Sequence, residues 1–246
     1  MHSAIVGVIA GLAITQVSIL ITTVYLHRSL SHKAVIFNRR VALLFRIVLW
    51  ITTGIRPRQW VAVHRKHHAF TDVPGDPHSP VLLGFYRVQF GNVCYYRKEA
   101  LNGDTVAKYA RALLPDRWDE LLFDRSFVGL AIGISILALV GGWKIALVAS
   151  IVHLVAYLGL SGAINAIGHS FGKRPYENLA TNNTWLALMT CGEGLHNNHH
   201  AAPTAAKLSF LKGQIDPAWP IISLLVKLHL ATVRLSAPKF KKQPAA

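Results

Sequence analysis

The sequence predicts an all-α membrane protein with about three membrane-spanning helices, interfacial helices and a histidine-rich helical cap on the cytoplasmic side. Three observations support this fold class. The composition is 52% hydrophobic and only 15% charged, which is more apolar than ordinary globular usage. The regions 4–26 and 127–168 are long and almost free of charge, and four tight groups of histidines follow or separate them. We expect a single membrane-bound domain over residues 1–246, because the sequence shows neither an internal repeat nor a soluble-domain boundary.

The spans are predicted at 4–26, 127–142 and 146–168. The first carries no charged residue and exceeds the ~20 residues needed to cross a bilayer core. It lacks the basic start and small-residue cleavage site of a signal peptide, so we expect it to be retained. Gly142 and Trp143 mark the turn between the other two segments, which together are predicted to form a transmembrane hairpin.

The segment 41–55 is predicted to be an interfacial helix. It has about 15 residues, too few for a span. It also contains Arg46, whose charge is costly inside a bilayer. If the segment crossed the membrane, the histidines at 27–32 and 64–68 would lie on opposite faces and could not share a site.

The C-terminal third predicts a second interfacial helix. Segment 221–235 alternates apolar positions with Lys227 and Arg234, a pattern typical of helices that lie in the membrane interface. We expect the tail 236–246 to be disordered. The polar stretch 71–125 holds most of the acidic residues and is predicted to build the outer part of the cap.

Basic residues place the cap on the cytoplasmic side. They flank the first two histidine groups, and the positive-inside rule therefore leaves only Met1–Ser3 outside. The net charge of +15 could suit nucleic acid, but no basic patch with interleaved aromatic residues stands out. Anionic lipid headgroups and an acidic redox partner explain the charge better, so we expect no nucleic-acid partner.

Nine of the thirteen histidines fall into four groups, and imidazole is the commonest metal ligand in proteins. Residues three or four apart share one face of a helix, so each triplet is expected to point three rings at one place. The first pair is five residues apart, which suits a fraying helix end. Scattered or core histidines would explain one such triplet, but not two triplets with a further pair. The groups are His27 and His32; His64, His67 and His68; His169; and His196, His199 and His200.

Nine imidazoles are too many for one metal ion and about right for two. Nitrogen-rich ligation with few carboxylates suits iron, and Cys94 and Cys191 are too far apart in sequence to suggest a thiolate site. Zinc is the static alternative, but a structural zinc site closes with four ligands. Two ions with open positions on a membrane protein point to oxygen chemistry on a lipid chain. His2, His153 and His229 lack such company and are predicted to bind no metal.

Polar neighbours are expected to orient the imidazole rings through hydrogen bonds. The candidates are Asp72, Asp76, Glu193 and either Asn197 or Asn198. For the two aspartates the alternative is a simple turn, since TDVPGDP is rich in turn residues.

Asn165 is a further candidate because it lies one helical turn before His169. A contact with the metal through water is favoured over direct ligation. The alternative is a hydrogen bond between membrane helices.

At these motifs the chain resembles the membrane fatty acyl desaturases of the stearoyl-CoA type. The matching strings are HRSLSH, WVAVHRKHHAFTDVPGDPHSP, NAIGHSFGKRPY and GEGLHNNHH, with a weaker match in DPAWPIISLLVKLHLA. Their order, their spacing and the hairpin between the second and third groups all agree, from about residue 20 to residue 235.

The resemblance implies a di-iron enzyme that uses O2 and two electrons to remove two hydrogens from a saturated acyl chain. An acyl-CoA or acyl-lipid would gain a cis double bond near the ninth carbon. The family's ligands fall on the nine grouped histidines and its water-linked asparagine on Asn165. The DPH element gives His78 a role toward the substrate or the rings. Gln59 and Trp60 are expected to line the acyl tunnel, although Trp60 also suits an interfacial anchor.

The resemblance also implies cofactors and partners. Two iron ions are expected, with zinc replacing them after overexpression. Electrons would come from a ferredoxin or b-type cytochrome and its reductase, because no such module is fused to this chain. The expected location is the bacterial cytoplasmic membrane. The family usually has four spans, whereas three are predicted here with an external N-terminus.

Two other functions are compatible with the same residues. Related histidine-rich di-iron membrane enzymes hydroxylate or decarboxylate lipids and alkanes. A non-catalytic metal carrier would need polar residues along its spans, whereas 4–26 contains only Gln16 and a few hydroxyl groups.

Overall fold

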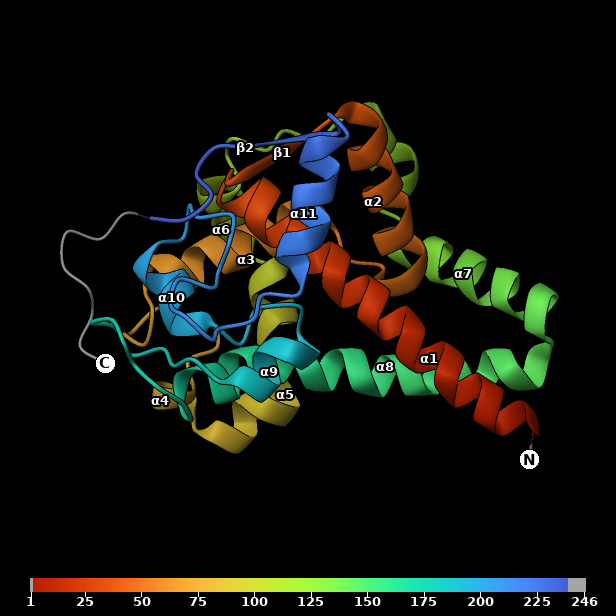
Figure 1. The fold of residues 1–246 in the computed structure, drawn as a ribbon. Helices are drawn as coiled ribbons and strands as arrows, with labels where there is room; N and C mark the ends of the chain where they lie inside the picture. The colour runs from red at the N-terminus through yellow and green to blue at the C-terminus, as the bar shows by residue number, and fades with distance from the viewer. Residues whose placement is uncertain (1, 239–246) are drawn as a thin grey trace.

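A computed structural model of the protein describes residues 2–238, which are mostly helical (Figure 1). The elements in chain order are α1 (His2–Ile21), the π-helix η1 (Thr22–Ser31), β1 (Val35–Phe37), α2 (Arg39–Thr53), α3 (Pro57–Ala69), α4 (Pro80–Leu83), α5 (Phe85–Ala100), α6 (Gly103–Tyr109), the π-turn η2 (Asp119–Phe123), α7 (Ser126–Gly141), α8 (Trp143–Ala166), the 3-10 turn η3 (Ile167–His169), α9 (Thr184–Met189), α10 (His196–Ala201), α11 (Ala218–Lys227) and β2 (Ala231–Val233).

Two continuous helices are long and apolar enough to cross a membrane: His2–Ser31 and Trp143–His169. Within their most apolar stretches only 33% and 22% of the residues are buried, so most of these side chains face outward, as in contact with lipid. The two helices pack against each other along their length. Gly11 permits the close approach, because a Cβ there would lie 2.6 Å from the Ala149 carbonyl oxygen.

The predicted hairpin corresponds to α7 and α8, which are joined at Gly142. Gly142 has a φ of 83°, a conformation that favours glycine. The 16 residues of α7 span about 24 Å, less than the ~30 Å of a bilayer core. The number of spans therefore stays a prediction.

Segment 41–55 corresponds to α2, which begins two residues earlier and ends at Thr53, is amphipathic and packs against α7. Its Arg46 is neutralised by two carboxylates: it donates to Asp116 at 2.6 Å and to Asp119 at 2.6 Å. On the other side, Gly133 of α7 lies directly against the Ile51 carbonyl oxygen. These contacts fix α2 against 116–119 and α7, and its position in the membrane interface stays a prediction.

The predicted helix over 221–235 is wrong beyond Lys227. The helix α11 ends there, and β2 pairs antiparallel with β1, with Val233 opposite Val35. His229 breaks the helix because it adopts a left-handed φ of 57°. The β-branched residues Thr232 and Val233 then favour a strand. The apolar pattern of the segment satisfied a helical period only in its first half.

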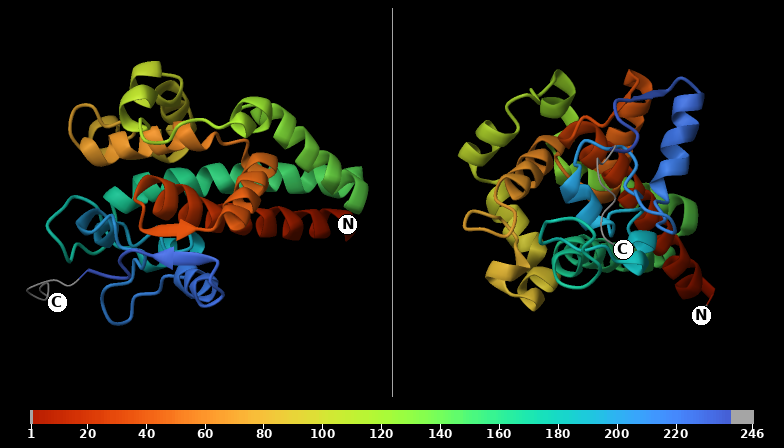
Figure 2. Two further views of the ribbon diagram at one scale, coloured as in Figure 1. Left: turned by 90° about the horizontal axis from the view of Figure 1, so that it is seen from above. Right: turned by 60° about the vertical axis from the view of Figure 1, so that its left-hand side comes forward.

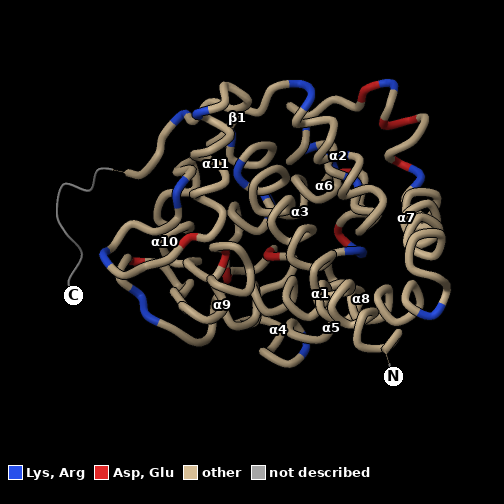
Figure 3. Tube along the Cα trace, turned by 45° about the vertical axis from the view of Figure 1, so that its right-hand side comes forward, with Lys and Arg blue, Asp and Glu red and all other residues tan. Residues whose placement is uncertain are grey.

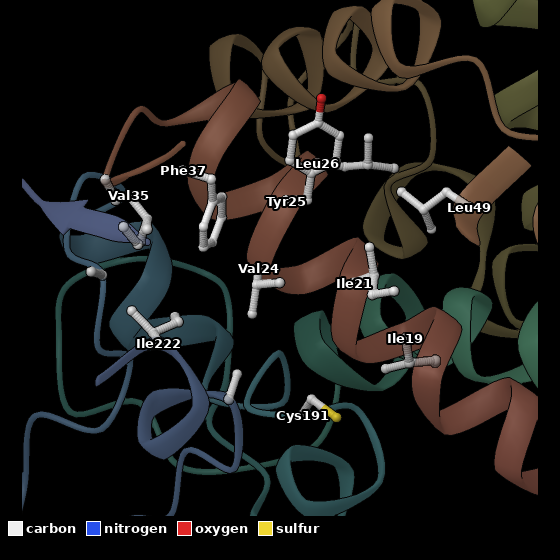
Figure 4. Packing of buried hydrophobic residues seen from close by; sticks show 14 of the residues in the cluster. Ile19, Ile21, Val24, Tyr25, Leu26, Val35, Phe37, Leu49, Cys191 and Ile222 are labelled. Carbon is white, nitrogen blue, oxygen red and sulfur yellow. The ribbon is translucent and has the colours of Figure 1, made fainter. Parts of the chain in front are cut away.

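The cap gathers around η1 at the end of α1 and α8 that lies opposite the N-terminus (Figure 2). Its apolar core joins η1 to β1 and α11, with Val24, Phe37 and Ile222 in one buried cluster (Figure 4). Most basic positions lie at the periphery of the chain trace, whereas several acidic ones lie inside it (Figure 3). The first three residues of the tail predicted at 236–246 are described by the structure, and there the Lys207 N–H donates to the Ser236 carbonyl. Residues 239–246 and Met1 lie outside the described residues.

Candidate metal centre

Five imidazoles form the first histidine group. Their ligand atoms lie within 4.8 Å of one another, and the rings come from η1 and its C-cap residue, α3 and α10: His27, His32, His64, His68 and His199. The Nε2 atom of His199 lies 3.0 Å from Nε2 of His27 and 2.8 Å from Nε2 of His68. A ring nitrogen carries either one proton or one lone pair, so it can make one good hydrogen bond and not two. A shared cation resolves this conflict, because nitrogens ~2.1 Å from one ion lie about 3 Å apart at right angles.

The π-helix explains how His27 and His32 reach the same point. In an α-helix, residues five apart are rotated by about 140°, which would turn the two rings away from each other. In η1 the chain makes wider turns, and the His32 N–H donates to the His27 carbonyl across five residues. The two ring centroids lie 4.9 Å apart. The five-residue spacing is thus produced by a regular feature and not by a frayed end.

Four imidazoles form the second group, again with ligand atoms within 4.8 Å: His67, His169, His196 and His200. The Nε2 atoms of His67 and His169 are buried and have no hydrogen-bond partner among the described residues. Buried polar atoms rarely stay unpaired, so these two nitrogens are suited to ligate a cation. The groups adjoin each other, since the rings of His68 and His200 stack at 4.5 Å.

The expectation that each triplet points at one place is wrong. On α3, His64 and His68 turn toward the first group and His67 toward the second. On α10, His196 and His200 belong to the second group and His199 to the first. The i and i+4 members of each triplet stay together, whereas the i+3 residue is rotated by about 100° from the i+4 residue. Each triplet therefore serves both groups, which places the two groups side by side.

Three carboxylates accept hydrogen bonds from the Nδ1 atoms of ligand candidates. Glu193 bonds His27 at 2.7 Å, Asp72 bonds His169 at 2.7 Å, and Asp76 bonds His67 at 3.0 Å. Burial, the largest single influence, raises the pKa of each carboxyl, but the hydrogen bonds and charges of the partner ring and other neighbours together hold the pKa below its ordinary value. An ionised carboxylate only accepts, so each Nδ1 keeps its proton and each Nε2 presents a lone pair.

Burial also keeps the rings neutral. It lowers the pKa well below the ordinary value, and neighbouring imidazoles lower it further, for His32, His64, His68, His196, His199 and His200. A neutral ring is the form that binds a metal. Each group offers imidazole nitrogens as ligands, and the carboxylates bond the far side of the rings. Such donor sets fit two ions of the iron or zinc type.

The segment 70–79 forms the predicted turn, and it also supplies side chains that bond the histidine rings. Asp72 sits at a left-handed φ of 59°, and its other oxygen accepts from Ser79 at 2.6 Å. His78 is buried beside His67, with ring centroids 5.0 Å apart, and both of its ring nitrogens lack a partner among the described residues. His78 therefore lies near the second group without belonging to it.

Asn197 is placed differently from its prediction. Its amide bonds the backbone of Tyr176 and Ala180 and the side chain of Asn178, so it holds a loop and no ring. Asn198 likewise bonds Asn182 and the Leu208 carbonyl.

The other candidates lie around the two groups. Asn165 is half-buried in the last turn of α8, before His169. Trp60 stacks on His64, with ring centroids 4.9 Å apart and planes within 15°. Gln59, its neighbour at the start of α3, is half-buried. Sequence reasoning did not find Thr23, which donates to Glu193. The sequence signal for this role was the position of Thr23, one helical turn before His27.

The histidines predicted to bind no metal lie outside both groups. His153 is satisfied within the helix bundle, with Nε2 donating to the Thr52 carbonyl at 2.9 Å and Nδ1 3.0 Å from Thr15 Oγ1. His2 and His229 are exposed.

Comparison with known proteins agrees with the motifs. The model of the fatty acid desaturase family matches residues 3–210. The chain is 33% identical to an acyl-CoA C20 Delta5-desaturase of Anemone leveillei, over 86% of this chain and 68% of the relative. It is also 33% identical to an sn-2 palmitoyl-lipid 9-desaturase of Nostoc sp. (strain 36), over 86% of this chain and 75% of the relative. A hex-5-enoyl-(acyl-carrier protein) acetylenase of Moorena producens is 28% identical over 92% of this chain and 75% of its own length.

The family model spans most of the chain, and these relatives are matched over most of their length. The resemblance seen in the histidine motifs is thereby confirmed. The chain belongs to the fatty acid desaturase family and is an oxidoreductase.

Proposed function

We propose that this protein is a di-iron, O2-dependent desaturase that introduces a cis double bond into a saturated fatty acyl chain, near the ninth carbon. The observation that carries the proposal is the convergence of nine imidazoles on two adjacent points in a desaturase-family chain. Two bound iron ions would supply O2 activation and hydrogen removal. The nitrogen donors fit iron, and zinc is expected to replace it after overexpression.

The protein's own residues hold the reaction in place. Nine rings would hold the metals, with Asp72, Asp76 and Glu193 fixing three of the rings from behind. The second group is mostly buried and the first is half-buried or buried, which would limit the access of bulk water to bound metals. We expect the Trp60 ring, stacked on His64, to form a wall beside the first group along which the acyl chain lies. Gln59 is expected to line the same passage, and Asn165 to hold a water beside the second group.

The proposed substrate is an acyl-CoA or an acyl-lipid. The names of two relatives support these classes, since one acts on acyl-CoA and the other on a palmitoyl-lipid. The lipid-acting relative is named a 9-desaturase, which supports the ninth carbon. The Delta5 enzyme makes the fifth carbon the competing position, and the acetylenase points to chains that are already unsaturated.

Product analysis tests the function. Cells of a lipid-making host that express the protein should gain a monounsaturated acid, seen by gas chromatography with location of the double bond. Cells expressing His64→Ala are the matched control. A hydroxylated acid or a shortened hydrocarbon would favour the hydroxylase or decarboxylase. A protein that holds metal but changes no lipid would favour a non-catalytic role.

Electron supply gives a first prediction. We propose that an acidic carrier, a ferredoxin or a small b-type cytochrome served by its reductase, docks on the basic cap surface. Arg97 and Lys98 are exposed there, and Arg56 and Arg58 are half-buried. Arg65 does not belong to this surface, because its guanidinium bonds backbone carbonyls of Leu30, Ser31 and Tyr109.

Turnover at sub-saturating carrier should fall as salt rises from 0.1 M to 1 M, because the Debye length shrinks from ~10 Å to ~3 Å. Steady-state turnover in a detergent that preserves activity measures this, with metal content checked at each salt concentration. A turnover rate that does not change with salt concentration would show that the basic residues serve only membrane orientation and lipid binding.

Membrane topology gives a second prediction. We propose that the protein lies in the bacterial cytoplasmic membrane with the cap in the cytoplasm. Reporters fused after Ile55 and after Leu235 should both read cytoplasmic, and one at Gly142 should read external. The contact of His32 with His64, 2.8 Å between Nε2 atoms, requires 27–32 and 64–68 to share a side. Opposite readings for fusions after His32 and Ile55 would contradict the shared centre.

A further inference from the structure

A buried ion pair outside both histidine groups joins three distant parts of the chain. The guanidinium of Arg28 donates to both carboxylate oxygens of Asp216, at 3.0 Å each. It also donates to the carbonyls of Ala206 at 2.9 Å and Cys191 at 3.3 Å. The side chains of Arg28 and Asp216 are 1% and 0% exposed. Asp216 in turn accepts from the backbone of Leu208 at 2.8 Å.

Such a pair is a poor device for stability alone. Removing two charges from water costs free energy that their attraction need not recover, and an apolar pair of similar volume often stabilises as well or better. What the arginine fork adds is direction, because its planar donors fix a carboxylate in one orientation. The pair therefore points to a need for fixed geometry at this place.

The surroundings of the pair show which geometry is fixed. Arg28 directly follows His27 in η1, and it bonds the carbonyl of Cys191, two residues before Glu193. Glu193 closes the loop by bonding the His27 ring. His27 is thus fixed in two ways. The side chain of Arg28 anchors the adjacent backbone of η1, and Glu193 bonds the His27 ring.

The turn at 191–192 depends on the same pair. Cys191 and Gly192 both have positive φ, 51° and 105°, which is costly for a cysteine. A Cβ on Gly192 would lie 2.8 Å from Nη2 of Arg28, so the guanidinium packs directly over this backbone. The chain then leads into α10, which carries His199 of the first group.

We propose that Arg28 and Asp216 are positioning residues for the first histidine group. They lock η1, the 190–195 turn and the 206–218 segment together, so that His27 and His199 meet before a metal binds. The inference rests on the proposed two-metal centre, and it predicts a loss confined to the first group.

The test isolates the first group. In a His196→Ala background the second group is broken, and one ion per chain is expected at the first. Arg28→Met with Asp216→Leu removes both charges together, which avoids a lone buried charge. Arg28→Lys keeps the charge but loses the fork. Purified proteins are loaded with Co2+, and the affinity by chelator competition and the visible absorption spectrum are recorded.

The double variant should bind Co2+ at least about 10-fold more weakly, with an altered spectrum, and Arg28→Lys should fall between it and the parent. In a His64→Ala background, where the second group alone remains, the same substitutions should leave Co2+ affinity unchanged. Arg46→Met is the matched control, because it breaks an ion pair with Asp116 and Asp119 that lies away from the rings.

Two outcomes would overturn the inference. A double variant with parental affinity and spectrum would leave the pair a purely structural role. Equal weakening in both backgrounds, or with Arg46→Met, would show general destabilisation. If the double variant does not fold, Arg28→Lys decides alone. If the His196→Ala parent protein binds no ion at the first group, the proposed centre is refuted instead. This result would be seen before any variant of Arg28 or Asp216 is made.

Discussion

A His64→Ala variant is expected to lose desaturation, by at least about 100-fold, and to hold one metal ion per chain where the unsubstituted protein holds two. His64 contributes one of five rings to the first group, and its loss is expected to weaken metal binding there enough that the ion is released. The effect should exceed the ~10–100-fold typical of removing an outer partner. His68→Ala and His199→Ala should behave alike. Metal per chain is measured by elemental mass spectrometry beside product analysis.

The controls are the histidines outside both groups. His2→Ala, His153→Ala and His229→Ala should keep two ions and most activity. His153→Ala alone should lower stability, by ~1–3 kcal/mol, because it leaves the Thr52 carbonyl and Thr15 without their partner. An unsubstituted protein with one ion or none, or a His64→Ala protein with two, would contradict the allocation of rings to groups.

Neutralising the carboxylates behind the rings is expected to have the next largest effect. In Glu193→Gln, Asp72→Asn and Asp76→Asn the shape is kept, but the amide can donate to Nδ1 and favour the wrong tautomer. Metal affinity should fall ~10–100-fold. Glu193→Gln should weaken the first group, through His27, and the two aspartate variants the second, through His169 and His67.

Chelator competition on each variant measures this effect, and Asp104→Asn on the exposed face of α6 is the matched control. The selectivity is the informative part of the result. Weakening of both groups by every variant would mean that the carboxylates support the fold and not particular rings. No weakening by any of them would leave only the turn chemistry of the 70–79 segment as their role.

Much of the candidate site could be predicted because histidines at helical spacing leave a local signature. His64 and His68, or His196 and His200, are one helical turn apart, and that spacing is visible without the fold. The division of each triplet between two groups was not visible. It depends on how α3 and α10 face each other, which is set by packing between segments more than one hundred residues apart.

Long-range polar contacts escaped prediction for the same reason. Arg28 and Asp216 are separated by 188 residues, and each alone resembles an ordinary surface charge. The strand β2 was missed because a three-residue strand is stabilised by hydrogen bonds to its partner β1, which lies far away in the sequence. Its own residues, ATV, fit the end of an apolar helix nearly as well.

The π-helix η1 has a consequence for how much of this protein a cell contains. A ten-residue π-helix is rare, and the same backbone can tighten to an α-helix that turns His32 away from His27. If the first group binds a metal as proposed, the binding free energy would add to the Arg28–Asp216 contacts that hold the wide turns in place. Chains without a bound metal would then open at η1 more often, and proteases act on such opened states. The steady-state abundance of the protein would then rise with the supply of its metal.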